Sequence, residues 1–464
     1  MKIEYHNPFF LRKHMSCVLK FALFLLFAAL SFHIFLSLSF KLVSFPHPPL
    51  DSTDLAQTQP QNDSRTECDI FVGEWVEDSI GPFYTNESCH FIETHQNCMR
   101  NGRPDTGYLH WRWNPAECEL PRFNPGMFLR LMRNKSWAFV GDSIQRNHVQ
   151  SLLCILSQVQ EVNSAQSCLD QLLMLFSSLF FKFKEVGSVY GSAFGDQSPN
   201  DNIPQVEEVI ETYHDEEYRS KKWHFPSHNF TLSVIWSPFL TKAAIFEDIN
   251  GISSSEIKLH LDELDEKWTS PYKDLDYVVF AGGKWFLKAA IYYENNTVTG
   301  CHNCLEKNMT DLGFAYAYRK AIGLVFDFIT RSDHKAFVLF RTTIPDHFEN
   351  GEWFSGGQCN RTVPFKGGEV EMKDVDVVMR NIELQEFDKV VKSGIGKAPT
   401  LKLLDTTRLS LLRPDGHPSW YRQFHPFAHG NGKVQIDCLH WCLPGPIDSW
   451  NDLLFQLLIH GVRA

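Results

Sequence analysis

A serine that follows a predicted buried strand has surroundings suited to covalent chemistry. Residues 137–140 predict the strand, Gly141 allows a sharp turn, and the apolar spacing of residues 144–156 predicts a helix. Ser143 therefore stands at the N-terminus of that helix, where unpaired backbone N–H groups can stabilise an oxyanion. These features predict a nucleophilic hydroxyl. The alternative is that Ser143, or Asp142 beside it, only caps the helix.

An acid and a histidine three residues apart lie near the C-terminus of the chain. Asp437 and His440 are expected on the same side of a helical turn. His440 is then able to accept the proton of Ser143, while Asp437 orients the imidazole and stabilises its charged form. Neither motif decides the matter alone, but together they predict a catalytic triad.

Three segments of the chain resemble a known family. A Gly-Asp-Ser followed far downstream by Asp-x-x-His resembles the SGNH/GDSL superfamily. The closer resemblance is to the plant trichome birefringence-like family of polysaccharide O-acetyltransferases, whose catalytic domain is of the PC-esterase type. It rests on Cys68–Trp75, Gly141–Asn147 and Asp437–Gly445, and it covers nearly all of residues 68–464.

The resemblance implies O-acetylation of a plant cell-wall polysaccharide in the Golgi. In the expected reaction Ser143 takes an acetyl group from a donor, and a sugar hydroxyl deprotonated by His440 then takes it from the acetyl-serine. Within the family the chain looks most like the hemicellulose acetyltransferases, which favours xyloglucan or mannan over xylan as the acceptor. An acetyl donor of unknown identity is required, and neither a bound cofactor nor a metal is expected.

Two other functions fit the same residues. If water reaches the acyl-enzyme in place of a sugar, the same triad makes a carbohydrate acetylesterase. A non-catalytic cell-wall polysaccharide-binding protein is the third possibility, although binding alone would not need a complete triad. The net charge of -11 argues against a nucleic-acid partner, and the 14% aromatic content suits a neutral polymer.

Two glycines are candidate oxyanion groups. Gly282 and Gly283 follow a predicted strand at residues 277–281. By resemblance they occupy the place where many SGNH enzymes supply an oxyanion-hole asparagine, and Ala281 removes that side-chain donor here. Their backbone N–H groups are possible substitutes, and a tight turn is the alternative.

Further polar residues are candidates for the cleft. Arg146 and Asn147 lie one helical turn after the nucleophile on the same face, where they either contact substrate or hold the site together. Asp346 and His347 follow another predicted strand and are expected to line the cleft. His417 is a second candidate base, although its Pro- and Gly-rich surroundings favour a shaped loop.

Strand and helix patterns alternate in the second half of the chain. Buried strands are predicted at residues 230–236, 277–281 and 335–340, and a helix at residues 312–331. This alternation predicts an α/β fold, a three-layer α/β/α sandwich of the SGNH type with a mainly parallel sheet. In such sheets the reactive residues gather beyond the carboxyl ends of the strands.

The chain before residue 68 predicts a membrane anchor and a stem. Residues 21–40 are apolar and long enough to span a bilayer, and the basic residues before them make 1–20 a cytosolic tail. The polar, Pro-rich residues 41–67 predict a disordered stem that carries residues 68–464 in the Golgi lumen as a catalytic domain. A cleaved signal peptide is the alternative. Asn-x-Ser/Thr sequons that agree with secretory exposure begin at Asn62, Asn86, Asn134, Asn229, Asn295, Asn308 and Asn360.

All cysteines except Cys17 lie beyond the predicted anchor, which suits disulfides in an oxidising compartment. The resemblance implies the pairs Cys68–Cys118, Cys89–Cys154, Cys98–Cys442 and Cys359–Cys438. Cys301 and Cys304 are then able to close a small loop, and Cys168 is left over. A zinc site at Cys301 and Cys304, or at Cys438, His440 and Cys442, is the alternative.

Residues 162–205 interrupt the resemblance. The run 172–181 would be apolar on all sides as a helix, and it has no evident partner. Valine codons begin with GT and a glutamine codon can end in AG, so Val162 and Gln205 suit the ends of a translated, unspliced intron. Its removal would join Glu161 to Val206. A genuine lineage-specific loop or lid is the alternative.

Overall fold

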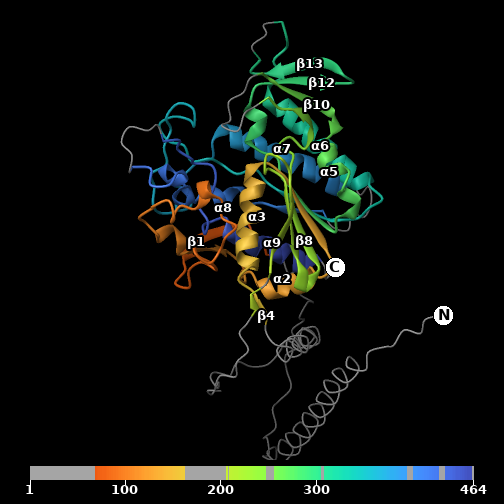
Figure 1. The fold of residues 1–464 in the computed structure, drawn as a ribbon. Helices are drawn as coiled ribbons and strands as arrows, with labels where there is room; N and C mark the ends of the chain where they lie inside the picture. Colours follow the sequence, from red (N-terminus) through yellow and green to blue (C-terminus); the bar gives the residue numbers. More distant parts are fainter. Residues whose placement is uncertain are drawn as a thin grey trace, which may run out of the picture. The chain divides into compact units, whose positions relative to one another are not determined.

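A seven-stranded sheet organises the part of the chain that the computed structural model describes, namely residues 68–161, 205–206, 208–246, 255–304, 308–393, 401–427 and 434–461 (Figure 1). In sheet order its strands are β15 (Leu401–Leu404), β14 (Phe337–Arg341), β11 (Tyr277–Phe280), β3 (Ser136–Gly141), β8 (Phe230–Trp236), β7 (Lys221–Phe225) and β6 (Ile210–His214). The strands from β15 to β8 are parallel, whereas β7 and β6 are antiparallel to their neighbours. The sheet is therefore mixed at one edge, which the sequence did not predict.

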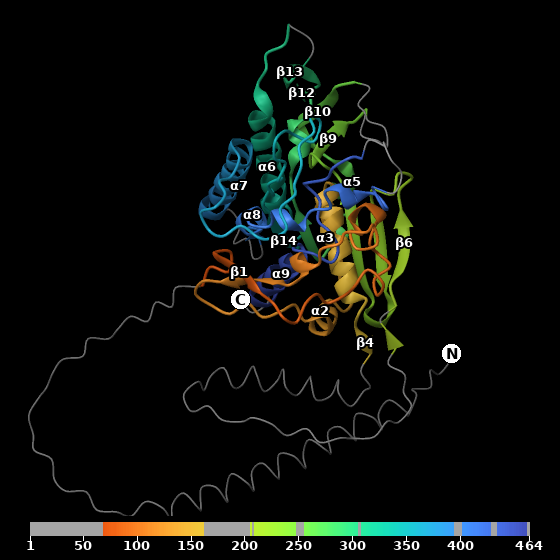
Figure 2. The ribbon, with the colours of Figure 1, turned by 90° about the vertical axis from the view of Figure 1, so that its left-hand side faces the viewer.

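Helices cover both faces of this sheet (Figure 2). One face packs against α2 (Pro125–Leu131), α3 (Ser143–Leu156) and α9 (Asp448–Gly461), and the other against α6 (Gly313–Arg331) and α7 (Asp374–Ser393). Strand β3 supplies side chains to both cores because its residues alternate between the two faces. Trp137 and Phe139 pack in the first core, while Ala138 and Val140 pack in the second. The described residues thus form an α/β/α sandwich.

The elements predicted around the nucleophile match the structure closely. The predicted strands at 137–140, 230–236, 277–281 and 335–340 correspond to β3, β8, β11 and β14, and the helices at 144–156 and 312–331 correspond to α3 and α6. The remaining short elements are α5 (Glu266–Thr269), α8 (Thr407–Leu411), η3 (Pro226–His228), η4 (Tyr272–Asp274), η5 (Lys284–Leu287), η6 (Pro414–Gly416) and η7 (Trp420–Arg422).

A second sheet lies outside what the sequence predicted. It contains β13 (Thr297–His302), β12 (Ala290–Glu294), β10 (Ile257–Leu264) and β9 (Thr241–Ala244) in that order. Strands β9 and β13 are largely exposed, so their composition lacks the apolar run that marks a buried strand. Strand β10 does alternate buried with more exposed residues, and β12 and β13 form a local hairpin, so these strands carry a local pattern that the prediction did not include.

An N-terminal region is tied to the rest of the fold by disulfides. It contains the antiparallel pair β1 (Gly73–Glu77) and β2 (Trp111–Pro115) with η1 (Thr94–Gln96) and η2 (Gly107–Leu109). The structure contains the four disulfides that the resemblance implies, namely Cys68–Cys118, Cys89–Cys154, Cys98–Cys442 and Cys359–Cys438. It also contains the disulfide Cys301–Cys304. Cys17 and Cys168 lie outside the described residues.

Two parts of the sequence prediction fall where the structure gives no description. The predicted tail, span and stem at residues 1–67 lie outside the described residues, and within the described ranges no helix is long and apolar enough to cross a membrane. Most of the suspected insertion is also outside them. Of its residues only Gln205 is described; the chain just before the segment, β4 (Gln160–Glu161), pairs antiparallel with β5 (Gln205–Val206) at its end.

Candidate active site

Ser143 lies where strand β3 turns sharply into helix α3. The turn requires glycine at position 141, because a Cβ there would lie 2.6 Å from the carbonyl oxygen of Ala281. The helix cap is supplied by Asp142, whose Oδ1 accepts the backbone N–H of Ile144 at 2.9 Å. Since Asp142 performs the capping, the hydroxyl of Ser143 is available for another partner.

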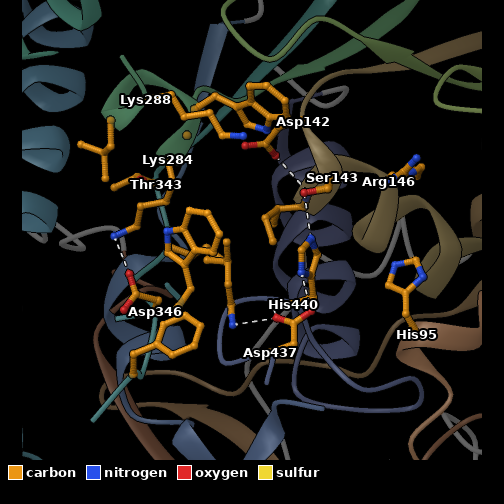
Figure 3. A pocket seen from close by; sticks show the side chains of 18 of the residues that line it. His95, Asp142, Ser143, Arg146, Lys284, Lys288, Thr343, Asp346, Asp437 and His440 are labelled. Atoms are coloured by element: carbon orange, nitrogen blue, oxygen red, sulfur yellow. Dashed lines mark hydrogen bonds and ion pairs between the residues drawn. The ribbon is translucent and has the colours of Figure 1, made fainter. Parts of the chain in front are cut away.

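That partner is His440. The distance from its Nε2 to Ser143 Oγ is 2.8 Å, and its Nδ1 lies 2.9 Å from Asp437 Oδ2 (Figure 3). With Nδ1–H donating to the carboxylate, Nε2 is free to accept the hydroxyl proton. The structure therefore brings the three predicted residues into one hydrogen-bonded row, although they are widely separated in the sequence.

The segment that carries Asp437 and His440 is not the helical turn expected from their spacing. Asp437 Oδ1 accepts the backbone N–H groups of Leu439 at 3.1 Å and His440 at 3.0 Å. A side-chain oxygen thus closes the turn in place of a backbone carbonyl. The three-residue spacing still brings acid and imidazole together, but through a turn that the aspartate itself builds.

Asp437 has a second cationic partner, which the sequence gave no reason to expect. Arg422 donates from a terminal guanidinium nitrogen to Asp437 Oδ2 at 2.6 Å. Burial alone would raise the pKa of Asp437, but His440, its hydrogen bonds and the Arg422 guanidinium outweigh burial and hold the pKa well below its ordinary value. Asp437 is consequently ionised at any pH at which the protein would work.

Asn147 holds the site together and does not line the cleft. Its side-chain oxygen accepts the backbone N–H of Trp441 at 2.8 Å, and its side-chain nitrogen donates to the carbonyl of Trp441 at 3.3 Å. Both bonds are buried, so Asn147 fixes the residue next to His440 against helix α3. Disulfides at Cys438 and Cys442 restrain the same segment from both sides.

His347 and His417 also support this segment and are not bases for Ser143. His417 Nδ1 donates to the carbonyl oxygen of His440 at 2.7 Å, and its Nε2 lies 2.7 Å from His347 Nδ1. Burial lowers the pKa of His347 to about 4 and of His417 to about 3. The expectation that His347 lines the cleft is wrong, whereas Asp346 does line it.

A cleft of about 1250 Å³ opens over the triad. Gly282 and Gly283 line it, and each approaches a neighbour too closely for any side chain. A Cβ at Gly282 would lie 2.6 Å from the Tyr318 ring, and one at Gly283 would overlap the Asp142 carboxylate. Close approach therefore explains both glycines, and Gly283 lies beside Asp142, the residue that precedes Ser143.

Arg146 lines the cleft on the side of Ser143 away from Lys284 and Asp346, as Figure 3 shows. Its guanidinium lies over the ring of Trp236, with its central carbon 5.5 Å from the ring centroid. Arg219 lies over the same ring at 5.2 Å. Of the two residues that follow the nucleophile by one helical turn, Arg146 alone is in a position to touch substrate.

A buried ion-pair cluster supports the opposite side of the cleft. Lys284 pairs with Asp376 and with Asp346 at 3.1 Å, and Lys373 pairs with Asp346 at 2.6 Å. Burial opposes ionisation of Asp346, but Lys284 and Lys373 outweigh it and lower the pKa of Asp346 to about 2. The cluster ties the segment after Gly283 to the start of α7.

The described residues include one group of side chains close enough together to hold a metal ion, His260, Asp262 and Glu263 of β10. None of the three lines the cleft. This group is therefore separate from the residues that line the cleft over the triad.

Comparison with known proteins agrees with this geometry. The GDSL/SGNH-like acyl-esterase family found in Pmr5 and Cas1p, the PC-esterase family, matches residues 120–186 and 202–457. The chain belongs to the PC-esterase family. The PMR5 N-terminal domain matches residues 66–119, directly before the PC-esterase domain. The PC-esterase match is interrupted at residues 187–201 only, so residues 162–186 and 202–205 of the suspected insertion lie inside the match.

The PC-esterase chain is also similar to curated plant proteins along most of its length. It is 53% identical to protein trichome birefringence-like 25 of Arabidopsis thaliana over 439 residues, which cover 90% of this chain and 86% of the relative. It is 38% identical to xyloglucan O-acetyltransferase 1 of Populus trichocarpa over 437 residues, which cover 90% of each chain. A protein of the same name in Arabidopsis thaliana is 38% identical over 421 residues, which cover 90% of this chain and 86% of the relative.

The N-terminal region contributes to the cleft one side chain, His95, that the sequence did not predict there. His95 lines the cleft, and its ring centroid lies 6.1 Å from that of His440 in an edge-on arrangement (Figure 3). Burial, followed by the nearby His440, Arg422 and Arg146, lowers the pKa of His95 to about 3. A neutral imidazole thus faces the triad. Neither His95 nor Arg422 belongs to a motif, so only the folded chain reveals them.

Proposed function

We propose that the protein is an O-acetyltransferase that acetylates a hydroxyl of a plant cell-wall hemicellulose. The observation that carries this proposal is the hydrogen-bonded row of Ser143, His440 and Asp437 along a cleft of about 1250 Å³. Such a cleft is large enough for several sugar units of a polymer. The relatives named xyloglucan O-acetyltransferase support the reaction and the acceptor class. As acceptor we prefer xyloglucan or mannan over xylan, a ranking that rests on the resemblance alone.

In the first half-reaction His440 Nε2 takes the proton of Ser143, and Ser143 Oγ forms a bond to the carbonyl carbon of the acetyl donor. The resulting oxyanion is stabilised by backbone N–H groups at the start of α3 and at Gly282 and Gly283. When the oxyanion collapses, the bond to the donor's leaving group breaks, and that group takes the proton from His440. Ser143 is left as an acetyl ester.

In the second half-reaction the acceptor hydroxyl enters the space left by the leaving group. His440 Nε2 takes its proton, the sugar oxygen attacks the acetyl carbon, and Ser143 leaves with the proton returned by His440. Asp437 holds the imidazole in one tautomer and stabilises its positive charge during both steps. Arg146 and His95 line the space in which donor and acceptor meet.

A carbohydrate acetylesterase is the second candidate, because the matched family is described as acyl-esterases. The two activities share the acetyl-serine and differ only in whether water or a sugar hydroxyl attacks it. The experiment is to incubate the purified full-length protein with an acetyl donor and with xyloglucan, mannan and xylan oligosaccharides, and to identify the products by mass spectrometry.

Three outcomes of this experiment are distinct. Acetylated oligosaccharide that is lost in Ser143→Ala, with a rate at least about 10⁴-fold lower, supports the acetyltransferase. Acetate without acetylated sugar supports the esterase. If a folded protein gives neither product with a range of donors but still binds an oligosaccharide, the non-catalytic binding protein replaces both.

We further propose that the protein is a single-pass type II Golgi membrane protein with its PC-esterase domain in the lumen. The apolar residues 21–40 and the disulfides of the described residues support this location. In sealed Golgi vesicles, protease should remove only the short tail and leave residues 68–464 intact until detergent is added. Digestion of the catalytic domain without detergent would place it in the cytosol.

A further inference from the structure

Two aromatic side chains at the cleft are left unexplained by the triad. Trp353 and Phe354 line the cleft that contains Ser143, yet 60% and 73% of their surfaces are exposed to solvent. Their ring centroids are 5.5 Å apart, with the planes nearly perpendicular. Large apolar surface that stays exposed beside an active site marks a binding surface, because its burial by a ligand is favourable.

The loop that carries these two rings, residues 349–358, is held in one conformation. Glu349 and Gln358 exchange backbone hydrogen bonds of 2.8 and 3.0 Å, which close the loop at its base. Inside it, Ser355 Oγ accepts the backbone N–H of Glu352 at 2.8 Å. Gly357 packs so closely on the carbonyl of Gly351 that no side chain fits there. The exposed rings are therefore presented by a preorganised loop, which lowers the entropic cost of binding.

Covalent and ionic contacts fix this loop relative to the triad. Cys359, directly after the loop, forms a disulfide with Cys438, which is adjacent to Asp437. Lys373 links the loop to the chain before it. Its Nζ lies 3.6 Å from Oε1 of Glu352, inside the loop, and 2.6 Å from Oδ1 of Asp346, which precedes the loop. Glu352, which precedes Trp353 in the chain, is thus partly neutralised, and the two rings offer flat apolar faces.

The chemistry of these faces identifies the ligand class. A pyranose ring with equatorial substituents exposes a flat face of C–H groups, and such faces pack on aromatic rings while the hydroxyls stay free for hydrogen bonds. The cation next to this loop, Lys373, is already paired with Glu352 and Asp346, which favours a neutral ligand over a polyanion. We propose that Trp353 and Phe354 form the acceptor subsite, where they bind the main-chain pyranose rings of a neutral β-linked polysaccharide and so bring one hydroxyl to His440. This inference rests on the proposed acetyltransferase function.

The test compares the two half-reactions in full-length protein carrying Trp353→Ala, Phe354→Ala or both. Phe424→Ala is the matched control, because Phe424 is 60% exposed but does not line the cleft. We expect the KM for neutral oligosaccharide acceptors to rise by about 10-fold for each ring removed, with little change in kcat at saturating acceptor. Formation of acetyl-Ser143 from a small aryl acetate, followed by intact-protein mass spectrometry, should stay as in the wild type and in the control.

A second measurement keeps the test independent of catalysis. In the Ser143→Ala background, calorimetry should show weaker binding of cello- or xylogluco-oligosaccharides after Trp353→Ala, and also after Trp353→Leu, which keeps apolar bulk but lacks a flat face. Unchanged oligosaccharide binding and unchanged acceptor KM would overturn the subsite. Failure of the proposed function looks different: the wild type then transfers no acetyl group, while loss of oligosaccharide binding on removal of the rings still supports the aromatic subsite.

Discussion

Arg422 and His440 donate to the same oxygen of the Asp437 carboxylate, at 2.6 and 2.9 Å. The carboxylate that stabilises the imidazolium is therefore shared with a permanent cation. Arg422 keeps Asp437 ionised, but its charge also opposes the positive charge that His440 acquires when it accepts a proton. The arginine thus acts on the same carboxylate oxygen that orients His440.

Removal of this guanidinium should slow the first half-reaction. In Arg422→Gln the Asp437 carboxylate loses the donor at 2.6 Å and one of the charges that hold its pKa low, so it orients His440 less firmly. We expect kcat/KM for acetyl-enzyme formation to fall by about 10-fold. Arg422→Lys retains the charge and should keep kcat/KM nearer to the wild-type value. Equal loss of activity in both variants would show that the charge of residue 422 is not what matters.

The closeness of Gly283 to Asp142 makes a second prediction. Gly283→Ala would force a methyl group into the carboxylate that caps α3, and this displaces both the turn and the N-terminus that carries Ser143. We expect kcat to fall by about 100-fold, the usual effect of misplacing an oxyanion donor, while the acceptor KM changes little. Gly107→Ala is the control, because the space around Gly107 is open. Equal kcat values for the two variants would exclude the Gly282–Gly283 turn from catalysis.

The local part of this site could be predicted from the sequence because local rules determine it. An apolar run, a glycine and a capping aspartate define the corner at Ser143, and the three-residue spacing brings Asp437 near His440 even though the turn is not helical. His95 and Arg422 could not be predicted, since each reaches the site through contacts between distant segments. The second sheet was missed for another reason, because its strands β9 and β13 lack an apolar run. Asn147 shows the intermediate case, in which helical periodicity gives the face but packing decides the role.

A buried carboxyl group behind the cleft should make stability depend on pH. Glu383 accepts bonds from the Tyr318 hydroxyl and from the backbone N–H of Thr343 at 2.9 and 3.0 Å. Burial raises the pKa of Glu383 from 4.5 to about 8, against the opposing effects of these bonds and of Arg341. Between these two values the folded protein holds a proton that the unfolded chain releases. The stability from this group is therefore complete below about pH 4.5 and is lost as the pH rises toward about 8.

Glu383→Gln should remove this dependence, because glutamine has the same shape and does not titrate. We expect the urea midpoint of the variant to rise relative to that of the wild type between pH 5 and 8. The slopes of the two free energies of unfolding against pH should differ by the equivalent of up to about one bound proton. Glu371→Gln, at an exposed glutamate, is the control and should track the wild type. Parallel curves for Glu383→Gln and the wild type would show that Glu383 is ionised in the folded protein at neutral pH.

The pairing of β4 with β5 makes removal of residues 162–205 a sharp test of the intron hypothesis. Gln160 pairs with Val206 and Glu161 with Gln205, so Glu161 and Val206, which flank the segment, already belong to neighbouring strands. Paired α-carbons in an antiparallel ladder are about 5 Å apart, so a direct bond from Glu161 to Val206 requires only a local rearrangement. A second variant that links Glu161 to Gln205 through Asn-Gly would retain the pair with a two-residue hairpin.

We expect both deletion variants to fold with an unfolding midpoint no lower than that of the full chain and to give at least equal acetyl transfer. Deletion removes an apolar run without touching the Cys89–Cys154 disulfide that anchors α3 nearby. Peptide mapping of the native protein should show Glu161 joined directly to Val206. Abundant native peptides from residues 162–205, together with loss of transfer in both variants, would instead make the segment a working part of the enzyme, since a passive intron product cannot be required for catalysis.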